Sequence, residues 1–375
     1  MVYRKLGRSG VKVSRLGFGS MRLPMVKIGS EYFVDIGRSV DIMQYAFRRG
    51  VNYVDAGFLY CNNESEIAVG KALKGWRDKI TLVTKATKLR MENPGDLRRM
   101  LEHQLYKLDT DYIDFYCFHG IGWENFHSHD KKTGWIKDLK KAHEEGLVKH
   151  IGFSFHDKPQ SMFKLVDLGY FEMVTCQYNY LDRKNAEAMA YAKKEGLGTV
   201  VMGPVGGGRL AGMPGFLKDK KDIEFSNAAN LALRFVFSNP SVDVVLSGMN
   251  SKKMVAENVK ASEEGALNRE EYKKINGLLE KTEKMAEIYC TGCGYCMPCA
   301  QGVNIPGRFE ALVAYKVYGM KEYARRVYHR VREEEKKTDG KGICIECGEC
   351  EKKCPQDIEI IKQLKETEKI LGKKG

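Results

Sequence analysis

Eight of the eleven cysteines lie in two short tracts near the end of the 375-residue chain. Most neighbouring cysteines within a tract are two residues apart, with Gly292, Gly294 and Gly348 between them. Such spacing lets several thiolates of one loop face a single cuboidal iron–sulfur cluster, because glycine allows the backbone to wrap it and leaves amides free to bond the sulfides. The predicted ligands are Cys290, Cys293, Cys296 and Cys299 of the first tract, and Cys344, Cys347, Cys350 and Cys354 of the second.

The second tract matches the ferredoxin run C-x2-C-x2-C-x3-C-P in every spacing, up to Pro355. In two-cluster ferredoxins the fourth cysteine of this run ligates the other cluster. The run therefore predicts one 4Fe–4S cluster on Cys290, Cys293, Cys296 and Cys354, and another on Cys344, Cys347, Cys350 and Cys299. The first tract departs from the run, since its last gap is two residues and not three.

Zinc sites and disulfides are the alternatives for these cysteines. Zinc is usually held by two pairs of ligands separated by a longer loop, and the first tract instead packs four cysteines into ten residues. Disulfides belong to oxidising compartments, whereas the N-terminus has no apolar segment typical of a secretion signal. The pattern favours iron–sulfur clusters and predicts a cytoplasmic protein.

The segment between the two tracts carries apolar residues at helical spacing over residues 308–336, interrupted by Gly319. This pattern indicates an α-helical ferredoxin-type domain over residues 286–375. The charged stretch from Arg325 to Lys341 is either a solvated helix face or a surface that docks a ferredoxin or another redox protein.

Residues 1–285 alternate short β-like runs with longer helical patterns, which argues for a parallel sheet. Eight such units predict a (β/α)8 TIM barrel. A doubly wound sheet is the alternative, but no G-x-G-x-x-G follows the first run. The expected strands are residues 15–19, 52–56, 80–86, 112–118, 150–154, 173–177, 198–202 and 242–247, and the clearest helices are 35–50, 96–107, 135–145, 185–195 and 228–237.

Polar residues stand where three of these strands end, which is where a TIM barrel carries its chemistry. Asp55 ends the second run, with Tyr60 five residues on, Lys85 lies near the end of the third, and His119 follows the fourth. An Asp–Lys pair alone is more often an ordinary salt bridge, and a single Tyr usually belongs to the core. Four such residues at successive strand ends favour a catalytic site.

Three segments resemble the aldo-keto reductase family, and the resemblance covers nearly all of residues 1–285. They are the opening YRKLGRSGVKVSRLGFG, the segment NYVDAGFLY followed by ESEIAVG, and DYIDFYCFH, which ends at His119. Some members also carry a C-terminal ferredoxin-like domain. The resemblance implies that Tyr60 is the general acid, that Lys85 lowers the pKa of this phenol, that Asp55 pairs with Lys85, and that His119 positions the carbonyl oxygen.

The same resemblance implies a nucleotide site for NADPH or NADH. Its residues are Ser154, Gln177, Met202, Gly203, Pro204, Gly206, Gly207, Gly208, Arg209, Gly248, Glu257 and Asn258. Gln177 would bind the nicotinamide carboxamide, the glycines and Arg209 would face the pyrophosphate, and Glu257 and Asn258 would contact adenine. Phe155, Met202, Gly248 and Met254 depart from the family pattern. The last two stand where NADP-preferring members place Lys and Arg.

Three hypotheses fit these patterns. The leading one is a reductase of a small carbonyl or related substrate whose clusters relay electrons to or from a partner. The second is an electron-transfer protein whose barrel is a binding or docking module, and the third is a redox sensor. Hydride carries two electrons whereas a cluster takes one at a time, so a bound flavin is possible although no fingerprint for it is visible.

The net charge and the motifs of the chain limit the kinds of partner that it is expected to bind. A formal net charge of +13 suits anionic partners such as a dinucleotide or an acidic electron carrier. No recognisable nucleic-acid-binding module and no apolar run long enough to cross a bilayer are visible. The segment Gly120–Lys132, which holds Trp123, Phe126, His127 and His129, is expected to be a loop that shapes the substrate pocket.

Overall fold

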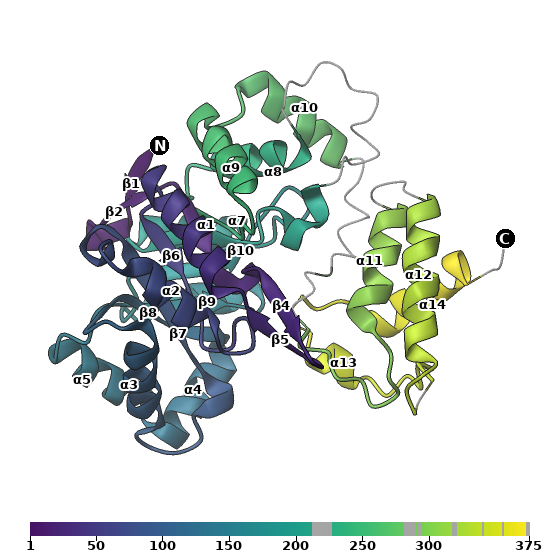
Figure 1. Cartoon of the computed structure of the whole chain (residues 1–375), viewed down its shortest axis with the longest axis horizontal. Coiled ribbons are helices and arrows are strands. Elements are labelled where there is room, and N and C mark those ends of the chain that lie inside the picture. Colours follow the sequence, from purple (N-terminus) through teal and green to yellow (C-terminus); the bar gives the residue numbers. More distant parts are fainter. Residues whose placement is uncertain are drawn as a thin grey trace. The chain divides into compact units, whose positions relative to one another are not determined.

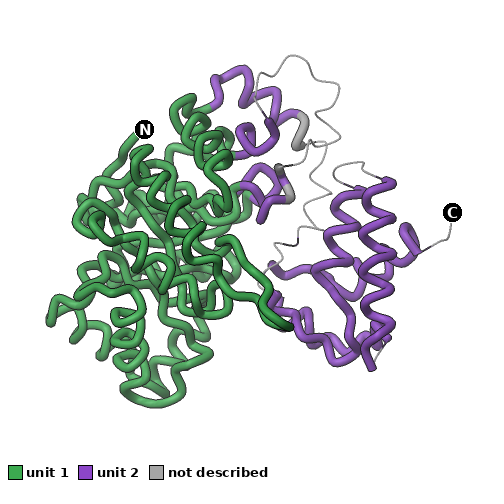
Figure 2. Tube along the Cα trace, in the orientation of Figure 1, with its two compact units in different colours: residues 1–178, 183–204, 233–266 green, residues 179–182, 205–232, 267–375 purple. Residues whose placement is uncertain are grey.

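The structure is a computed structural model that describes residues 1–211, 227–280, 290, 294–316, 321–339, 341–354 and 356–372. The predicted boundary between residues 285 and 286 lies outside these residues, as do Cys293, Gly319, Pro355 and the side chain of Arg209. The chain groups into two compact units (Figure 2). The first comprises residues 1–178, 183–204 and 233–266, and the second comprises 179–182, 205–232 and 267–375.

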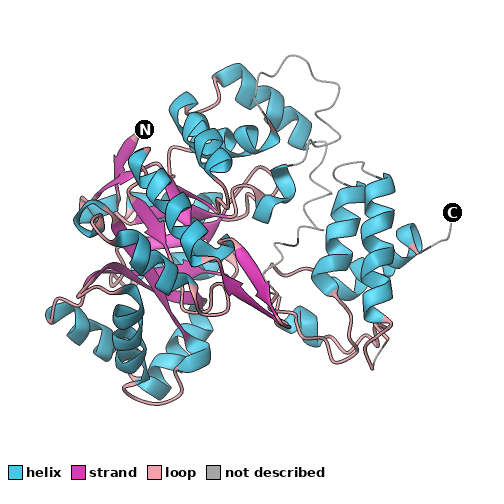
Figure 3. Ribbon diagram, in the orientation of Figure 1, coloured by secondary structure: helices cyan, strands magenta, loops and turns pink. Residues whose placement is uncertain are grey.

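The first unit is built around a closed barrel of eight parallel strands (Figures 1 and 3). In barrel order the strands are β10 (Met173–Gln177), β11 (Gly198–Met202), β12 (Val244–Ser247), β3 (Leu16–Gly19), β6 (Tyr53–Asp55), β7 (Thr81–Thr87), β8 (Ile113–Ile121) and β9 (Val148–Phe155). Each overlaps one of the eight runs expected from the sequence, so the predicted TIM barrel is confirmed.

Helices of the first unit follow the strands in the chain. They are α1 (Ile36–Arg48), α2 (Ser65–Leu73), α3 (Asp96–Leu108), α4 (Trp123–Thr133), α5 (Trp135–Glu144), α6 (Pro159–Asp167), α7 (Ala186–Lys194) and α9 (Lys252–Glu264). A surface hairpin, β4 (Met25–Ile28) and β5 (Glu31–Val34), was not anticipated from the sequence. Helix α8 (Ala228–Phe237) has residues in both units, and α10 (Arg269–Glu280) belongs to the second.

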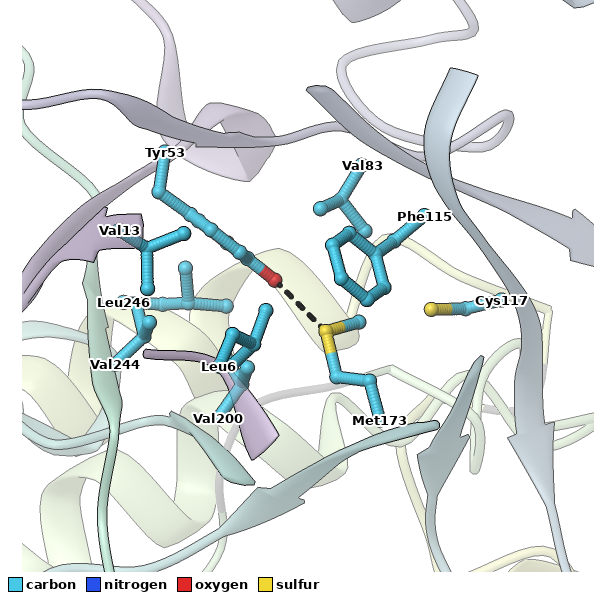
Figure 4. Packing of buried hydrophobic residues seen from close by; sticks show 10 residues of the cluster. All are labelled: Leu6, Val13, Tyr53, Val83, Phe115, Cys117, Met173, Val200, Val244 and Leu246. Atoms are coloured by element: carbon cyan, nitrogen blue, oxygen red, sulfur yellow. Dashed lines mark hydrogen bonds between the residues drawn. The ribbon is translucent and has the colours of Figure 1, made fainter. Parts of the chain in front are cut away.

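The barrel interior is filled by apolar side chains at its N-terminal end (Figure 4). Leu6 and Val13, from the antiparallel pair β1 (Tyr3–Lys5) and β2 (Lys12–Ser14) and its connection, pack against the barrel residues of this cluster. A Cβ on Gly7 would collide with the backbone at Gly198, the first residue of β11, so glycine is required for this close approach. The hairpin therefore plugs the bottom of the barrel and leaves chemistry to the opposite end.

The segment from Gly120 to Lys132 is not a loop, which corrects the sequence expectation. Strand β8 runs to Ile121 and helix α4 begins at Trp123. Its Phe126 is buried against Phe118, Trp135 and Phe171, with ring centroids 5.9, 5.5 and 5.7 Å away. The burial of Phe126 among aromatic rings from other segments stabilises the helix, and such contacts between distant segments are not visible in the local sequence.

The described C-terminal segment is helical, as the sequence predicted. It contains α11 (Ile305–Lys316), α12 (Lys321–Glu335), α13 (Glu349–Lys352) and α14 (Ile360–Leu371). Apolar faces pack together through Phe309, Leu312, Val327, Val331 and Leu364, all buried. None of the described helices has the length and apolar character that crossing a bilayer would require.

Candidate active site and iron–sulfur sites

Four polar side chains meet at the open end of the barrel. The ammonium of Lys85 on β7 lies 2.5 Å from Oδ1 of Asp55 on β6 and 2.7 Å from the carbonyl oxygen of Ala56. The side chains of Lys85 and Asp55 are 2% and 4% exposed, so the ion pair is buried. Lys85 Nζ lies 4.9 Å from the ring centroid of Tyr60, which makes an edge contact with His119 at a centroid separation of 5.7 Å.

A strained turn holds Tyr60 in place. The three residues after it, Cys61, Asn62 and Asn63, all have positive φ angles of 50°, 56° and 69°. Consecutive non-glycine residues in the left-handed region are costly and persist only where the surroundings fix them. A Cβ on Gly57 would stand 3.0 Å from Cζ of Tyr60, so the ring lies directly against the backbone of β6's exit loop. This turn aims the phenol at Lys85 and His119.

The electrostatics of the group differ in one respect from the sequence expectation. Shielding from water raises the pKa of Tyr60 above its ordinary value, and Lys85 opposes this shift without reversing it. Burial would lower the pKa of Lys85, but the Asp55 carboxylate raises it instead, so the ammonium stays charged. Lys85 therefore acts on Tyr60 as anticipated, yet in the protein without bound nucleotide the phenol keeps its proton through neutral pH.

Two imidazoles near the barrel mouth are held neutral. Burial, with smaller contributions from Lys85 and His156, lowers the pKa of His119 to about 3. Burial, followed by the charge of Lys184, lowers the pKa of His156 to about 4. His119 is thus a neutral hydrogen-bonding group at physiological pH, as expected for a residue that positions a carbonyl oxygen.

These two shifts predict a pH dependence of stability. An unfolded histidine binds a proton near pH 6.5, so between there and pH ~4 the unfolded chain holds more protons and stability falls as the pH falls. Each group contributes at most about 1.4 kcal/mol per pH unit. We expect His119→Gln and His156→Gln each to flatten the fall of Tm between these pH values, measured by thermal unfolding. The exposed His329→Gln is the control, and an unchanged slope in both variants would contradict the prediction.

A buried network behind Lys85 was missed in the sequence. The side-chain amide of Gln104 on α3 donates to the Lys85 carbonyl oxygen at 3.1 Å and to Oε1 of Glu66 on α2 at 2.5 Å. Lys107 pairs with the other oxygen of Glu66 at 2.6 Å, and the Tyr116 hydroxyl donates to Gln104 at 2.6 Å. The network fixes the backbone that carries Lys85. Glu66 lies in the ESEIAVG segment already noted, whereas nothing in the sequence singled out Gln104.

Several residues of the expected nucleotide site gather at the C-terminal ends of strands β9 to β12. Ser154 lies near the end of β9, and its hydroxyl accepts a hydrogen bond of 2.9 Å from the backbone amide of Gly120, the residue after His119. Gln177 and Met202 are register partners on β10 and β11, and Gly203 and Pro204 follow directly. Nε2 of Gln177 is buried without a hydrogen-bond partner among the described residues. An orphaned amide donor fits the carboxamide oxygen of a nicotinamide.

The remaining residues of the predicted nucleotide site differ in their burial and in the unit to which they belong. Asn258 on α9 is buried and donates to the Ser247 hydroxyl at 2.9 Å, while Glu257 is partly exposed. Gly206, Gly207 and Gly208 form a turn, with φ of 68° and 95° at the last two, and belong to the second unit. Ser154, Gln177, Met202, Gly203 and Gly248 therefore belong to one unit, and the glycine turn belongs to the other.

One further basic residue near this site was not anticipated. The stem of the exposed Arg22, which follows β3, lies against Gly248, whose added Cβ would stand 3.2 Å from Arg22 Cβ. Gly248 occupies a position where a lysine was expected for NADP preference. The absence of a side chain there makes room for an arginine from another strand end. The family pattern over residues 248–258 does not reveal this arginine, because Arg22 lies in a distant part of the sequence.

The second unit holds two cavities lined by cysteines. One, of about 170 Å³, is lined by Cys296, Cys299, Cys344, Cys347 and Cys350. A smaller one is lined by Cys290, Cys296 and Cys354. Cys293 lies outside the described residues.

The donor sets of both cavities fit 4Fe–4S clusters. Each iron of such a cluster takes a separate thiolate, so the ligands surround a cavity without converging on one point. Among the residues that the structure describes, no three Cys, His, Asp or Glu side chains approach closely enough to share a single ion. Cys299 lies with the second tract and Cys354 with the first, which supports the exchange of fourth ligands. The ligand assignment itself stays a prediction.

Comparisons with known proteins agree with this architecture. Residues 15–280 match the model of the aldo/keto reductase family, and residues 289–359 match that of the 4Fe-4S dicluster domain. L-galactose dehydrogenase of Arabidopsis thaliana is 27% identical over 312 residues, covering 75% of this chain and 95% of the relative. Aldo-keto reductase YhdN of Bacillus subtilis is 26% identical over 325 residues, covering 75% of this chain and 95% of the relative.

Solved structures give the same result. Aldo-keto reductase AKR11C1 from Bacillus halodurans, in its holo form, aligns with a TM-score of 0.63 and 29% identity, covering 74% of this chain and 96% of its own. An aldo-keto reductase from Klebsiella pneumoniae in complex with NADPH shares the fold, with a TM-score of 0.61 and 21% identity, and covers 74% of this chain and 96% of its own. About a quarter of this chain therefore has no counterpart in these structures.

Proposed function

This chain belongs to the aldo/keto reductase family, and from that membership we propose that its barrel reduces the carbonyl group of a small molecule with a nicotinamide nucleotide. We further propose that its 4Fe–4S dicluster domain exchanges electrons with a ferredoxin or another redox protein. The chain is an oxidoreductase on the evidence of its family and relatives.

The proposal of carbonyl reduction in the barrel rests on one observation, which is the convergence of the side chains of Tyr60, Lys85, Asp55 and His119. The Tyr60 hydroxyl donates its proton to the carbonyl oxygen as hydride reaches the carbonyl carbon, so the C=O π bond breaks while a C–H and an O–H bond form. A nicotinamide held through Gln177 would supply this hydride and would leave the step in its oxidised form. Lys85, held by Asp55 and Ala56, stabilises the phenolate that remains. Neutral His119 hydrogen-bonds the carbonyl oxygen and orients it.

NADPH or NADH is the proposed hydride donor. The orphaned Nε2 of Gln177 supports a nicotinamide at the ends of β10 and β11. The Klebsiella pneumoniae reductase, which shares the barrel, was solved with NADPH. Arg22 beside Gly248 offers a cation where the expected lysine is missing, which supports binding of a phosphorylated nucleotide.

Gly203→Ala tests the placement of the nucleotide. Gly203 has a φ of +65°, and a Cβ there would collide with the Gln177 side-chain amide. We expect the displaced amide to weaken nucleotide binding about tenfold, the effect of roughly 1.4 kcal/mol, with a smaller change in kcat. Fluorescence titration with NADPH and NADH measures it. Gly75→Ala, with a φ of +77° and open space around it, controls for backbone strain alone. Equal nucleotide affinity in the two variants would contradict the placement.

In the C-terminal domain, bound clusters supply one-electron chemistry that nicotinamide lacks. The chain's own contribution is to hold the described cysteines of both tracts around two cavities and to leave part of the second tract accessible, since Cys347 is exposed. An exposed ligand favours electron exchange with a partner protein. A flavin would help to join one-electron and two-electron steps, and the absorption spectrum of the protein as isolated tests for it.

One observation favours a second candidate, in which the barrel is a binding or docking module. Met202 and Gly248 stand where family members stack and anchor the nucleotide. The experiment that separates the candidates is turnover of a panel of aldehydes and ketones with NADPH and NADH by the purified holoprotein. Nucleotide oxidation matched by alcohol formation supports the reductase. Tight nucleotide binding without turnover of any substrate would favour the docking module.

A further inference from the structure

A buried ion pair lies at the centre of the C-terminal domain. Arg308 on α11 and Glu335 on α12 have side chains only 4% and 1% exposed. The guanidinium donates to the carboxylate from Nε at 3.0 Å and from Nη2 at 2.8 Å. Apolar residues of similar volume would join two helices at least as well, because charges are costly to remove from water. The pair therefore calls for a role beyond helix packing.

The ion pair also forms hydrogen bonds with backbone groups next to each cysteine tract. Nη2 of Arg308 donates to the carbonyl oxygen of Gly342 at 2.5 Å, and Gly342 lies two residues before Cys344. The backbone amide of Asn304, five residues after Cys299, donates to Oε1 of Glu335 at 2.7 Å. One ion pair thus contacts the exit of the first tract and the entry of the second.

The segments that flank the two tracts are also hydrogen-bonded to each other at this point. The Gly342 amide donates to the Gln301 carbonyl oxygen at 2.9 Å, and the Gly302 amide donates to that of Cys299 at 2.9 Å. Gly342 has a φ of +62°, and an added Cβ would stand 2.5 Å from Cβ of Glu335. The approach is close enough to require glycine, and it places Cys299 beside the segment that leads into Cys344.

A second arginine and a second carboxylate complete the network. Arg332 Nη1 donates to Glu335 at 2.8 Å and to the Gly342 carbonyl oxygen at 3.0 Å. Glu368 on α14 pairs with Arg308 at 3.4 Å and accepts from the Tyr328 hydroxyl. Two cations and two anions balance, so the network is locally neutral. Loss of Glu335 would leave Arg308 and Arg332 with one shared counter-charge.

We propose that Arg308 and Glu335 are positioning residues that hold Cys299 and Cys344 at one shared 4Fe–4S cluster. The inference rests on the proposed cluster assignment. The contacts of the pair reach Gly342 and Asn304, which flank Cys344 and Cys299, and both of these cysteines line the larger cavity and not the smaller one, so the clamp is expected to act on the cluster of the larger cavity. A cluster whose fourth ligand comes from a distant tract needs such a clamp, because spacing within one tract cannot fix that ligand.

The test is the metal content and electron paramagnetic resonance spectrum of full-length protein purified without oxygen. Glu335→Gln removes the carboxylate charge, and Arg308→Lys keeps the positive charge but loses the planar fork that reaches both Glu335 and Gly342. We expect both variants to lose about half of the wild-type iron and sulfide with helix content retained by circular dichroism. The remaining signal should match that of Cys344→Ala and differ from that of Cys290→Ala.

Glu322→Gln is the matched control, because Glu322 forms an exposed i,i+3 pair with Arg325 on the same helix, and it should keep full iron. Full iron in Glu335→Gln and Arg308→Lys would overturn the inference. Equal loss of both clusters in these two variants would also overturn it. So would a remaining signal that matches the signal of Cys290→Ala. Wild-type protein without iron would instead overturn the cluster assignment itself, so the two failures are distinguishable.

Discussion

Replacing Tyr60 by Phe lowers kcat for carbonyl reduction by about a thousandfold, in the range typical of losing a general acid. The phenol is the group that contacts both Lys85 and His119, and Phe fills the same space without a proton to give. Nucleotide affinity should stay within about twofold of wild type, because the change removes an interaction made only in the transition state. Steady-state kinetics and nucleotide titration measure the two effects separately.

Tyr53→Phe is the matched control for this variant. Tyr53 is a buried residue of strand β6 whose hydroxyl lies 3.4 Å from the sulfur of Met173, within the apolar cluster at the N-terminal end of the barrel (Figure 4). Its loss should cost about 1 kcal/mol of stability and leave kcat nearly unchanged. A Tyr60→Phe enzyme that keeps most of its kcat would remove the phenol from the proposed mechanism.

The second large effect is expected from paired cysteine substitutions. If Cys354 belongs to the cluster of Cys290, the double variant Cys290→Ala/Cys354→Ala damages one cluster only and keeps about half the iron, because each 4Fe–4S cluster depends on its own four thiolates. The double variant Cys344→Ala/Cys354→Ala damages both and loses nearly all of it. Iron and acid-labile sulfide per chain are the measurement.

The alternative assignment predicts the opposite order. With four ligands drawn from each tract alone, the variant lacking Cys344 and Cys354 would keep half the iron and the variant lacking Cys290 and Cys354 would lose it all. Two further double variants repeat the comparison for Cys299. If Cys299 shares a cluster with Cys344, Cys299→Ala/Cys344→Ala keeps about half the iron and Cys299→Ala/Cys290→Ala loses nearly all of it. Cys117→Ala, at a buried core cysteine, controls for the loss of a thiol.

The barrel was readable from the sequence because parallel strands buried on both faces are nearly continuous apolar runs. Strand β12, where Val244, Val245 and Leu246 are all buried, shows this most clearly. The polar residues at strand ends were noticeable because a charged group such as Lys85, close to Leu82 and Val83 in an expected strand, needs a partner when it is buried. Cysteine spacing carried comparable information, because cluster geometry restricts it.

What the sequence did not reveal depends on contacts between distant segments. Gln104 and Glu66 meet only because α2 and α3 pack beside β7, and neither residue type is unusual on a helix. Arg22 and Gly248 are far apart in the chain and come together only when the barrel closes. The net rise in the pKa of Tyr60 has the same origin, because shielding from water depends on the whole mouth of the barrel and outweighs the one charge that the sequence could identify.

The most direct test of the reductase is a crystal structure of the protein with NADP⁺ and an unreactive carbonyl or carboxylate ligand. The nicotinamide should lie at the ends of β10 and β11 with its carboxamide on Gln177, and the ligand oxygen should accept hydrogen bonds from Tyr60 Oη and His119. A nucleotide bound away from Gln177, or a ligand oxygen turned away from Tyr60, would contradict the proposed chemistry.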